Sequence, residues 1–202
     1  IEKKSVNNIM IALYAFVVIS FFITIVDIII RFPLQSEMID YNDIQAIVIN
    51  VLALLIQIVS FAYGFVNAIR GMLSPKRMGA VIVAFFAATC ITGTGNMVIY
   101  SNVQIVLWWI VLIIPNIVGA VATFAYFVSG KKSKIYSMII YLVAIWGMFR
   151  IIYSNYNLIV HANQYLSMNS TVRLVLEIAI HCLVIYQTYV LWIKRQNAID
   201  IS

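Results

Sequence analysis

The stretch IMIALYAFVVISFFITIVDIII, residues Ile9–Ile30, contains Asp27 as its only charged residue. A helix rises about 1.5 Å per residue, so a run of this length reaches across a hydrocarbon layer about 30 Å thick. The run does not alternate in polarity, and it is too long for a membrane β-strand of about ten residues. It is also too long for the apolar region of a signal peptide, and it lacks a small-residue cleavage site. We therefore expect a retained, membrane-spanning helix.

The rest of the chain has the same character. Hydrophobic residues make up 64% of the 202 residues and charged residues 10%, and the mean hydropathy is +1.01. A soluble domain is roughly half apolar and about a quarter charged. The composition therefore predicts an all-α, polytopic integral membrane protein, a single-domain bundle of six transmembrane helices over residues 1–202. The six predicted spans are Ile9–Ile30, Ile44–Ile69, Met78–Tyr100, Gln104–Val128, Ile135–Tyr153 and Thr171–Ile193.

Basic residues in the short connections predict the orientation of the bundle. Cytoplasmic connections carry an excess of Lys and Arg. One set of helix ends holds ten of the thirteen basic residues: Lys3, Lys4, Arg70, Lys76, Arg77, Lys131, Lys132, Lys134, Lys194 and Arg195. The other set holds Arg31 and Arg173. Both termini are therefore expected on the cytoplasmic side of the cell membrane. The net charge of +6 reflects this topology, and no nucleic-acid partner is predicted from it.

The last span carries a ladder of ionisable residues. In RLVLEIAIHC, Arg173, Glu177 and His181 follow at intervals of four, which puts them on one helix face. In the predicted orientation the ladder descends from the outer rim to the middle of the bilayer. Asp27 and Arg150 also fall near the outer ends of their spans. All charged residues within the spans thus lie in the outer half, where such residues usually face a protein interior or a wet cavity.

Neutral polar residues partly repeat this pattern. Asn50 lies in the outer half of the second span, and Asn96 closes the third. These positions predict an outward-facing polar pocket that accepts a small polar or zwitterionic solute. Arg150 would bind an anionic group there, and Asp27 or Glu177 a cationic one. The candidate substrate-binding residues are Asp27, Asn50, Asn96, Arg150, Glu177 and His181.

Several alternatives use the same residues. Arg150 could pair with Glu177 or Asp27 as a structural lock between helices, with asparagines as interhelical glue. Glu177 and His181 could offer two ligands to a metal, but no HExxH motif or second close pair supports a metal site. No serine nucleophile motif supports an intramembrane hydrolase. We therefore predict no enzyme, no metal and no cofactor.

Two further patterns bear on packing. Ala80, Ala84 and Ala88 repeat every four residues, and Gly119 with Thr123 does the same, so helices can approach closely there. We expect these faces to pack within the bundle. The inner halves of the spans are otherwise largely apolar, and no polar file leads to the cytoplasm. A continuous ion channel is therefore not predicted.

The function favoured by these patterns is that of a small-solute binding or transport subunit working with partner membrane subunits in the lipid bilayer. In size, helix count and outward polar positions the chain resembles the substrate-binding subunits of energy-coupling-factor vitamin transporters. It departs from their alanine face on the first helix, because Ala12 and Ala15 are only three residues apart. The alternative is a non-catalytic accessory, assembly or immunity-type membrane protein whose buried charges lock the bundle or contact a partner.

Overall fold

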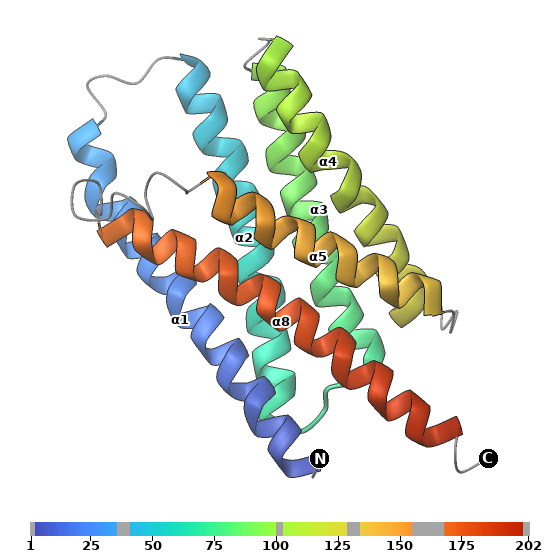
Figure 1. Cartoon of the computed structure of the whole chain (residues 1–202). Coiled ribbons are helices and arrows are strands. Elements are labelled where there is room, and N and C mark those ends of the chain that lie inside the picture. Colours follow the sequence, from blue (N-terminus) through green and yellow to red (C-terminus); the bar gives the residue numbers. More distant parts are fainter. Residues whose placement is uncertain (1–2, 36–40, 100–102, 129–133, 155–167, 200–202) are drawn as a thin grey trace.

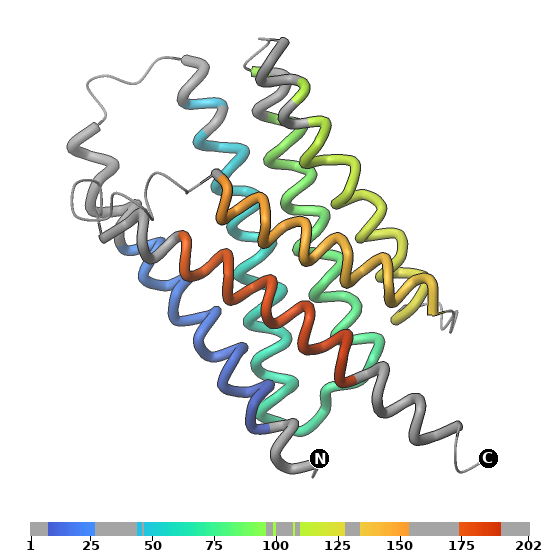
Figure 2. Tube along the Cα trace, in the orientation of Figure 1, coloured from blue at the N-terminus to red at the C-terminus, as the bar shows by residue number. Residues whose placement is uncertain are grey.

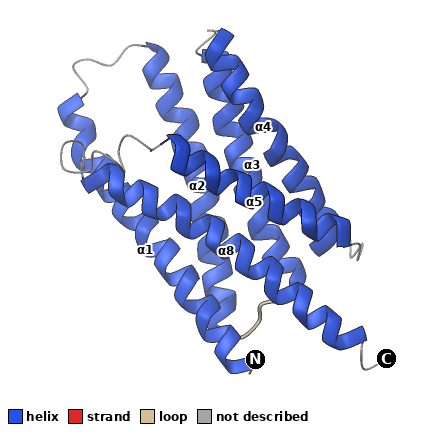
Figure 3. Ribbon diagram, viewed as in Figure 1, coloured by secondary structure: helices blue, strands red, loops and turns tan. Residues whose placement is uncertain are grey.

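The computed structural model describes residues 3–35, 41–99, 103–128, 134–154 and 168–199, and it is helical through nearly all of them (Figure 3). Side chains near some helix ends are outside the description. The helices are α1 (Lys3–Gln35), α2 (Tyr41–Ile69), α3 (Pro75–Ile99), α4 (Val103–Thr123) with a π-helical turn η2 (Phe124–Val128), α5 (Lys134–Ser154) and α8 (Met168–Ile199). The all-helical class predicted from the sequence is confirmed, and each helix contains most of one predicted span.

The helices form a closed ring. Each packs against the next along the chain, and α8 packs against α1, which joins the last helix to the first. Helix α8 therefore lies between α1 and α5, as the chain trace also shows (Figures 1 and 2). Helix α3 contacts α8 across the centre of the ring. Among the described side chains, these two helices expose the fewest large apolar groups, as expected of helices that meet in the middle.

The outer surface of the bundle is apolar, as in a helical membrane protein. Large apolar side chains are exposed along α1, α2, α4 and α5, among them Phe22, Val59, Val121 and Leu142. Within the described residues, five helices contain windows long and apolar enough to cross a membrane, and α8 contributes the shorter apolar stretch Leu174–Val190. These features are compatible with a multi-pass membrane protein.

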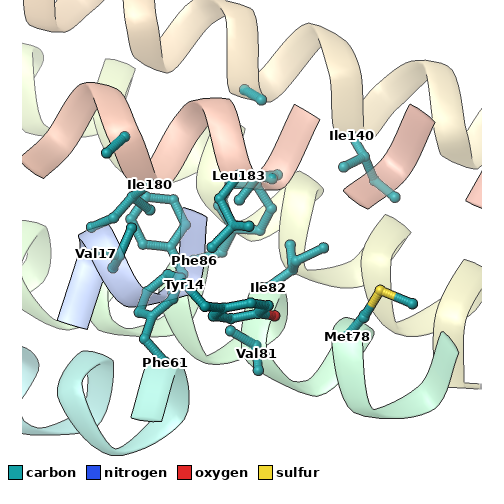
Figure 4. Packing of buried hydrophobic residues seen from close by; sticks show 14 of the residues in the cluster. Tyr14, Val17, Phe61, Met78, Val81, Ile82, Phe86, Ile140, Ile180 and Leu183 are labelled. Carbon is teal, nitrogen blue, oxygen red and sulfur yellow. The ribbon is translucent and has the colours of Figure 1, made fainter. Parts of the chain in front are cut away.

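The centre of the ring is filled by aromatic side chains. Phe61 of α2 contacts Tyr14 and Phe21 of α1, with ring centroids 6.3 and 5.7 Å away, and Phe85 of α3, at 6.4 Å. Phe85 in turn contacts Phe86. The close view shows Tyr14, Phe61 and Phe86 packed among aliphatic side chains of α3 and α8 (Figure 4). These contacts hold α1, α2 and α3 together with α8.

Helix α2 ends and α3 begins in a tightly bonded turn. Gly71 has a φ of 65°, and the N–H groups of Gly71 and Met72 donate to the carbonyls of Ala68 and Asn67 at 3.0 and 2.9 Å. This is the Schellman arrangement, in which a left-handed residue satisfies the last carbonyls of a helix. Ser74 then caps α3, because its hydroxyl accepts the Arg77 N–H at 3.3 Å. The Arg77 side chain fixes the turn by donating to the Asn67 side-chain oxygen and the Met72 carbonyl.

Replacing Gly71 with alanine is expected to lower the free energy of unfolding by roughly 1–2 kcal/mol, the cost of a left-handed conformation for a residue with a Cβ. A Cβ added at this position would have no other heavy atom within 4 Å, so the loss comes from the backbone alone. Asparagine tolerates this conformation better, and Gly71→Asn should lose less. Equilibrium unfolding in mixed detergent micelles measures both. Equal losses for the two variants would contradict the backbone explanation.

Helix α4 carries its proline inside the helix. Pro115 lacks an N–H, so one carbonyl of the preceding turn loses its usual donor. Next to it, the Asn116 side-chain amide donates to the Leu112 carbonyl at 2.7 Å. Asn116 thus serves the backbone of its own helix. The expected internal packing of small residues is found at Ala88, Gly119 and Thr123, which are buried, whereas Ala80 is exposed.

Candidate functional site

The deepest ionisable group predicted on α8, His181, is buried inside the bundle with 6% of its surface exposed. Its Nδ1 lies 2.7 Å from the carbonyl oxygen of Glu177, one turn earlier. A carbonyl oxygen only accepts, so Nδ1 carries the hydrogen and donates. In the neutral ring this leaves the lone pair on Nε2. The hydrogen bond fixes the ring toward α3 and α5.

Two neighbours close around the imidazole. The Phe85 ring of α3 meets it edge-on, at 5.2 Å between centroids and an interplanar angle of 90°. On α5, the neighbour is Gly147, where a Cβ would lie 2.2 Å from His181 Nε2. Real Cβ atoms do not approach so closely. The absence of a side chain at position 147 therefore lets α5 and α8 approach at the level of His181.

Arg150 follows Gly147 by about one turn on α5 and brings a positive charge to the same interface. It is close enough to interact electrostatically with both Glu177 and His181 of α8. Its guanidinium Nε is buried and has no hydrogen-bond partner among the described residues. The α5–α8 interface thus combines a cation, a carboxylate and an imidazole. We call Arg150, Glu177 and His181 the outer trio, after the orientation predicted from the sequence.

Helix α1 brings hydroxyl groups to a similar depth. Tyr14 of α1 meets Gln187 of α8, and the two helices run antiparallel. Six residues onward on α1 and six back on α8 therefore place Ser20 near the level of His181. Ser20 and Thr24 are buried, but their hydroxyls donate to carbonyls of their own helix, at 2.8 and 2.9 Å. Ser20 and Thr24 thus share a buried face of α1, and both hydroxyls are already bonded.

The other predicted site residues are distributed differently. The side chains of Asp27 and Asn96 lie outside the described residues, as does that of Arg173 at the top of the predicted ladder. Asn50 is half-buried on α2, which packs against α1 and α3 in the described part of the chain. The residue before it, Ile49, contacts the Gly95 position of α3, so α2 packs against α3 at this level. The structure brings the outer trio together, whereas Asn50 lies on α2, which packs against neither α5 nor α8 in the described part of the chain.

A second buried polar contact was not predicted from the sequence. The Gln187 side-chain amide donates to the hydroxyl of Tyr14, and both residues are fully buried. The Tyr14 ring lies against Gly64 of α2, where a Cβ would be 2.3 Å from a ring carbon. We call Tyr14 and Gln187 the inner pair. Gln187 is itself a polar residue inside an apolar run and could have been noticed, but nothing local marks Tyr14 as its partner.

Metal binding has limited support in this geometry. In the part of the chain that the structure describes, no group of three or more His, Cys, Asp or Glu side chains could hold a metal ion. Beside Glu177 and His181, a third ligand would have to come from Asp27 or His161. The Asp27 side chain and all of His161 fall outside that part.

The arrangement can therefore do two things chemically. The guanidinium of Arg150 can bind a carboxylate or phosphate oxygen, or it can neutralise Glu177 and hold α5 against α8. Comparisons of the chain with protein-family models, with curated proteins and with solved structures found no match.

Proposed function

We propose that the protein is a small-solute binding or transport subunit of the cell membrane, with six transmembrane helices and both termini in the cytoplasm. The solute binds in the outer half of the bundle, at the outer trio, and it presents a carboxylate or phosphate group to Arg150. Partner membrane subunits complete its passage.

The observation that carries this proposal is the buried Nε of Arg150, which has no acceptor among the described residues. A buried N–H that makes no hydrogen bond is costly, and an arginine that binds an oxyanion uses its N–H groups in pairs. An anionic group of a solute would supply the missing acceptor. Glu177 and His181, which interact electrostatically with Arg150, would bind other parts of the same small molecule.

The charge pattern supports the proposed orientation. Helix α1 begins and α8 ends at the same end of the bundle (Figure 1). The α2–α3 turn, with Arg70, Lys76 and Arg77, lies toward that end as well. An excess of basic residues at one end is the usual mark of the cytoplasmic side. The outer trio would then face away from the cytoplasm.

Ligand-dependent thermal stabilisation tests the proposal. Purified full-length protein in detergent micelles would be heated with a panel of monocarboxylates, amino acids and phosphate esters. A ligand at one hundred times its Kd stabilises the folded state by about 2.7 kcal/mol. We expect at least one compound to raise the Tm of the wild type and to lose this effect in Arg150→Gln.

The matched control is Arg70→Gln, which removes an exposed arginine of the α2–α3 turn and should keep the ligand effect. Two results would contradict the proposal. One is a panel in which no compound raises the Tm of the wild type. The other is an equal Tm shift in the wild type and in Arg150→Gln.

A second candidate is favoured by the packing around His181. The close approach at Gly147 and the aromatic neighbour Phe85 leave the imidazole tightly enclosed. This is what a structural lock requires. In that case the protein is a non-catalytic accessory, assembly or immunity-type subunit, and the outer trio holds α5 against α8.

A further inference from the structure

The inner pair leaves hydrogen-bonding groups unused in the core of the bundle. The Gln187 amide uses Nε2 to donate to Tyr14, while its Oε1 is buried and has no partner among the described residues. The Tyr14 oxygen accepts that bond, so the hydroxyl hydrogen of Tyr14 is not used in it. The Gln187 Oε1 acceptor, the second N–H of its amide and the Tyr14 hydroxyl hydrogen are therefore left unused on two adjacent side chains. If the amide is turned over, Oε1 accepts from the Tyr14 hydroxyl, and the two N–H groups of Nε2 and a lone pair of the Tyr14 oxygen are left unused instead.

Among the described residues, none supplies a partner for the Gln187 Oε1. The nearby Thr188 hydroxyl donates to the carbonyl of Val184 on its own helix, at 2.8 Å. Tyr14 is enclosed by Phe61 and by the Gly64 position of α2. The bilayer core holds no water, so polar groups buried in a membrane bundle are satisfied by protein or by ordered guests such as water.

We propose that the inner pair is a second binding site, for a small neutral guest that both donates and accepts hydrogen bonds. Water, a hydroxyl and a primary amide share this chemistry. The guest accepts from one of the two side chains and donates to the other. A charged guest does not fit, because the pair is built from an uncharged amide and a phenol.

The inner pair and the outer trio are separate sites that share helix α8, through Gln187 and His181. Gln187 follows His181 by six residues, which is about 9 Å along α8. Leu183 and Val184, both buried, lie between them on α8. Across the core, His181 contacts Phe85, Phe85 contacts Phe61, and Phe61 contacts Tyr14. An aromatic layer thus separates the two polar sites.

One consequence rests on the proposed function. If the outer trio binds a solute, the inner pair is the next polar position toward the cytoplasmic end, and the Phe61–Phe85 contact is the barrier between the two. The inner site itself does not depend on that function, because its unused groups are present in either case.

Water-edited solid-state NMR tests the inner site directly. The full-length protein, with ¹³C-labelled glutamine, would be reconstituted in deuterated lipid bilayers, and the Gln187 side-chain signal assigned as the one lost in Gln187→Met. With water as the guest, magnetisation passes from water to this carbonyl at short mixing times. If it does not, ¹³C-labelled acetamide is added, and a solute-type guest shifts the Gln187 signal. No transfer from water and no shift with acetamide would overturn the proposal.

Two variants make the assignment specific. Tyr14→Phe removes the phenol oxygen and leaves Gln187 in place, so the transfer or shift at Gln187 should fall at least several-fold. Thr24→Val removes a buried hydroxyl that is already bonded to the Ser20 carbonyl, and it should change nothing at Gln187. An unchanged Gln187 signal in Tyr14→Phe would overturn the site as a joint property of the pair. Loss of ligand binding at Arg150 would not affect this readout, so the two proposals fail independently.

Discussion

Replacing Gly147 with alanine is expected to lower the free energy of unfolding by about 1–3 kcal/mol, the usual cost of forcing extra atoms into a packed core. The new methyl group would lie 2.2 Å from Nε2 and 2.6 Å from Cδ2 of His181. The imidazole cannot easily turn away, because Nδ1 is bonded to the Glu177 carbonyl and Phe85 lies against the ring. Alanine is the better helix former by up to about 1 kcal/mol, so the measured loss is what remains after that gain.

The partner in this clash can be identified by a double mutant. His181→Ala removes the ring, and in the Gly147→Ala/His181→Ala protein the new methyl group has space. We expect a coupling energy of roughly 0.5–3 kcal/mol between the two sites, as for residues in contact. The free energies come from equilibrium unfolding in mixed micelles. Additive effects would show that His181 is not what Gly147 accommodates.

Gly119→Ala provides a graded comparison on a neighbouring helix. There the nearest atom to the added Cβ is a methyl carbon of Val143, at 2.9 Å, followed by the Phe86 ring at 3.1 Å. The overlap is smaller, so the loss of stability should be smaller than at Gly147. A larger loss of stability for Gly119→Ala than for Gly147→Ala would mean that α4 and α5 are packed more rigidly than α5 and α8.

The helices of this fold could be predicted because a membrane leaves few choices. Apolar runs of about twenty residues set the number of helices, since backbone groups in lipid must be bonded within the helix. The ends were less predictable. Helices α1 and α8 extend to Lys3–Gln35 and Met168–Ile199, beyond the apolar runs, and hydropathy does not register polar turns that continue a helix. The π-helical turn Phe124–Val128 has no signal in the apolar pattern.

The outer trio could be predicted from the sequence because two of its residues are close together in the chain. Glu177 and His181 are four residues apart, so one helix face must carry both, and α5 is the helix that precedes α8. The inner pair joins residues 173 positions apart, on the first and last helices. No periodicity in either helix specifies that α1 and α8 are neighbours. The expectation of largely apolar inner halves therefore missed the contact between Tyr14 and Gln187, because it considered each helix alone.

The charge pair of the outer trio is expected to separate the two candidate functions. In a structural lock, Arg150→Met and Glu177→Met should each lower the free energy of unfolding by roughly 2–3 kcal/mol. This is less than the loss of about 3–5 kcal/mol typical of a fully buried pair, because both side chains are half-buried. Each single variant leaves one charge without its partner in a medium of low polarity. The double variant replaces both charges with apolar groups and should recover most of the loss.

A solute site gives a different pattern in the same cycle. Groups that are held ready for a ligand contribute little to the stability of the free protein, so both single variants should unfold near the wild-type midpoint while ligand-dependent stabilisation disappears. Combining Arg150→Met with Lys134→Met, an exposed lysine at the start of α5, is the control for a distant, non-interacting pair and should be additive. Large single losses with recovery in the double variant, and no ligand effect in the wild type, would assign Arg150 and Glu177 to the α5–α8 lock. Small single losses with an Arg150-dependent ligand effect would assign them to solute binding.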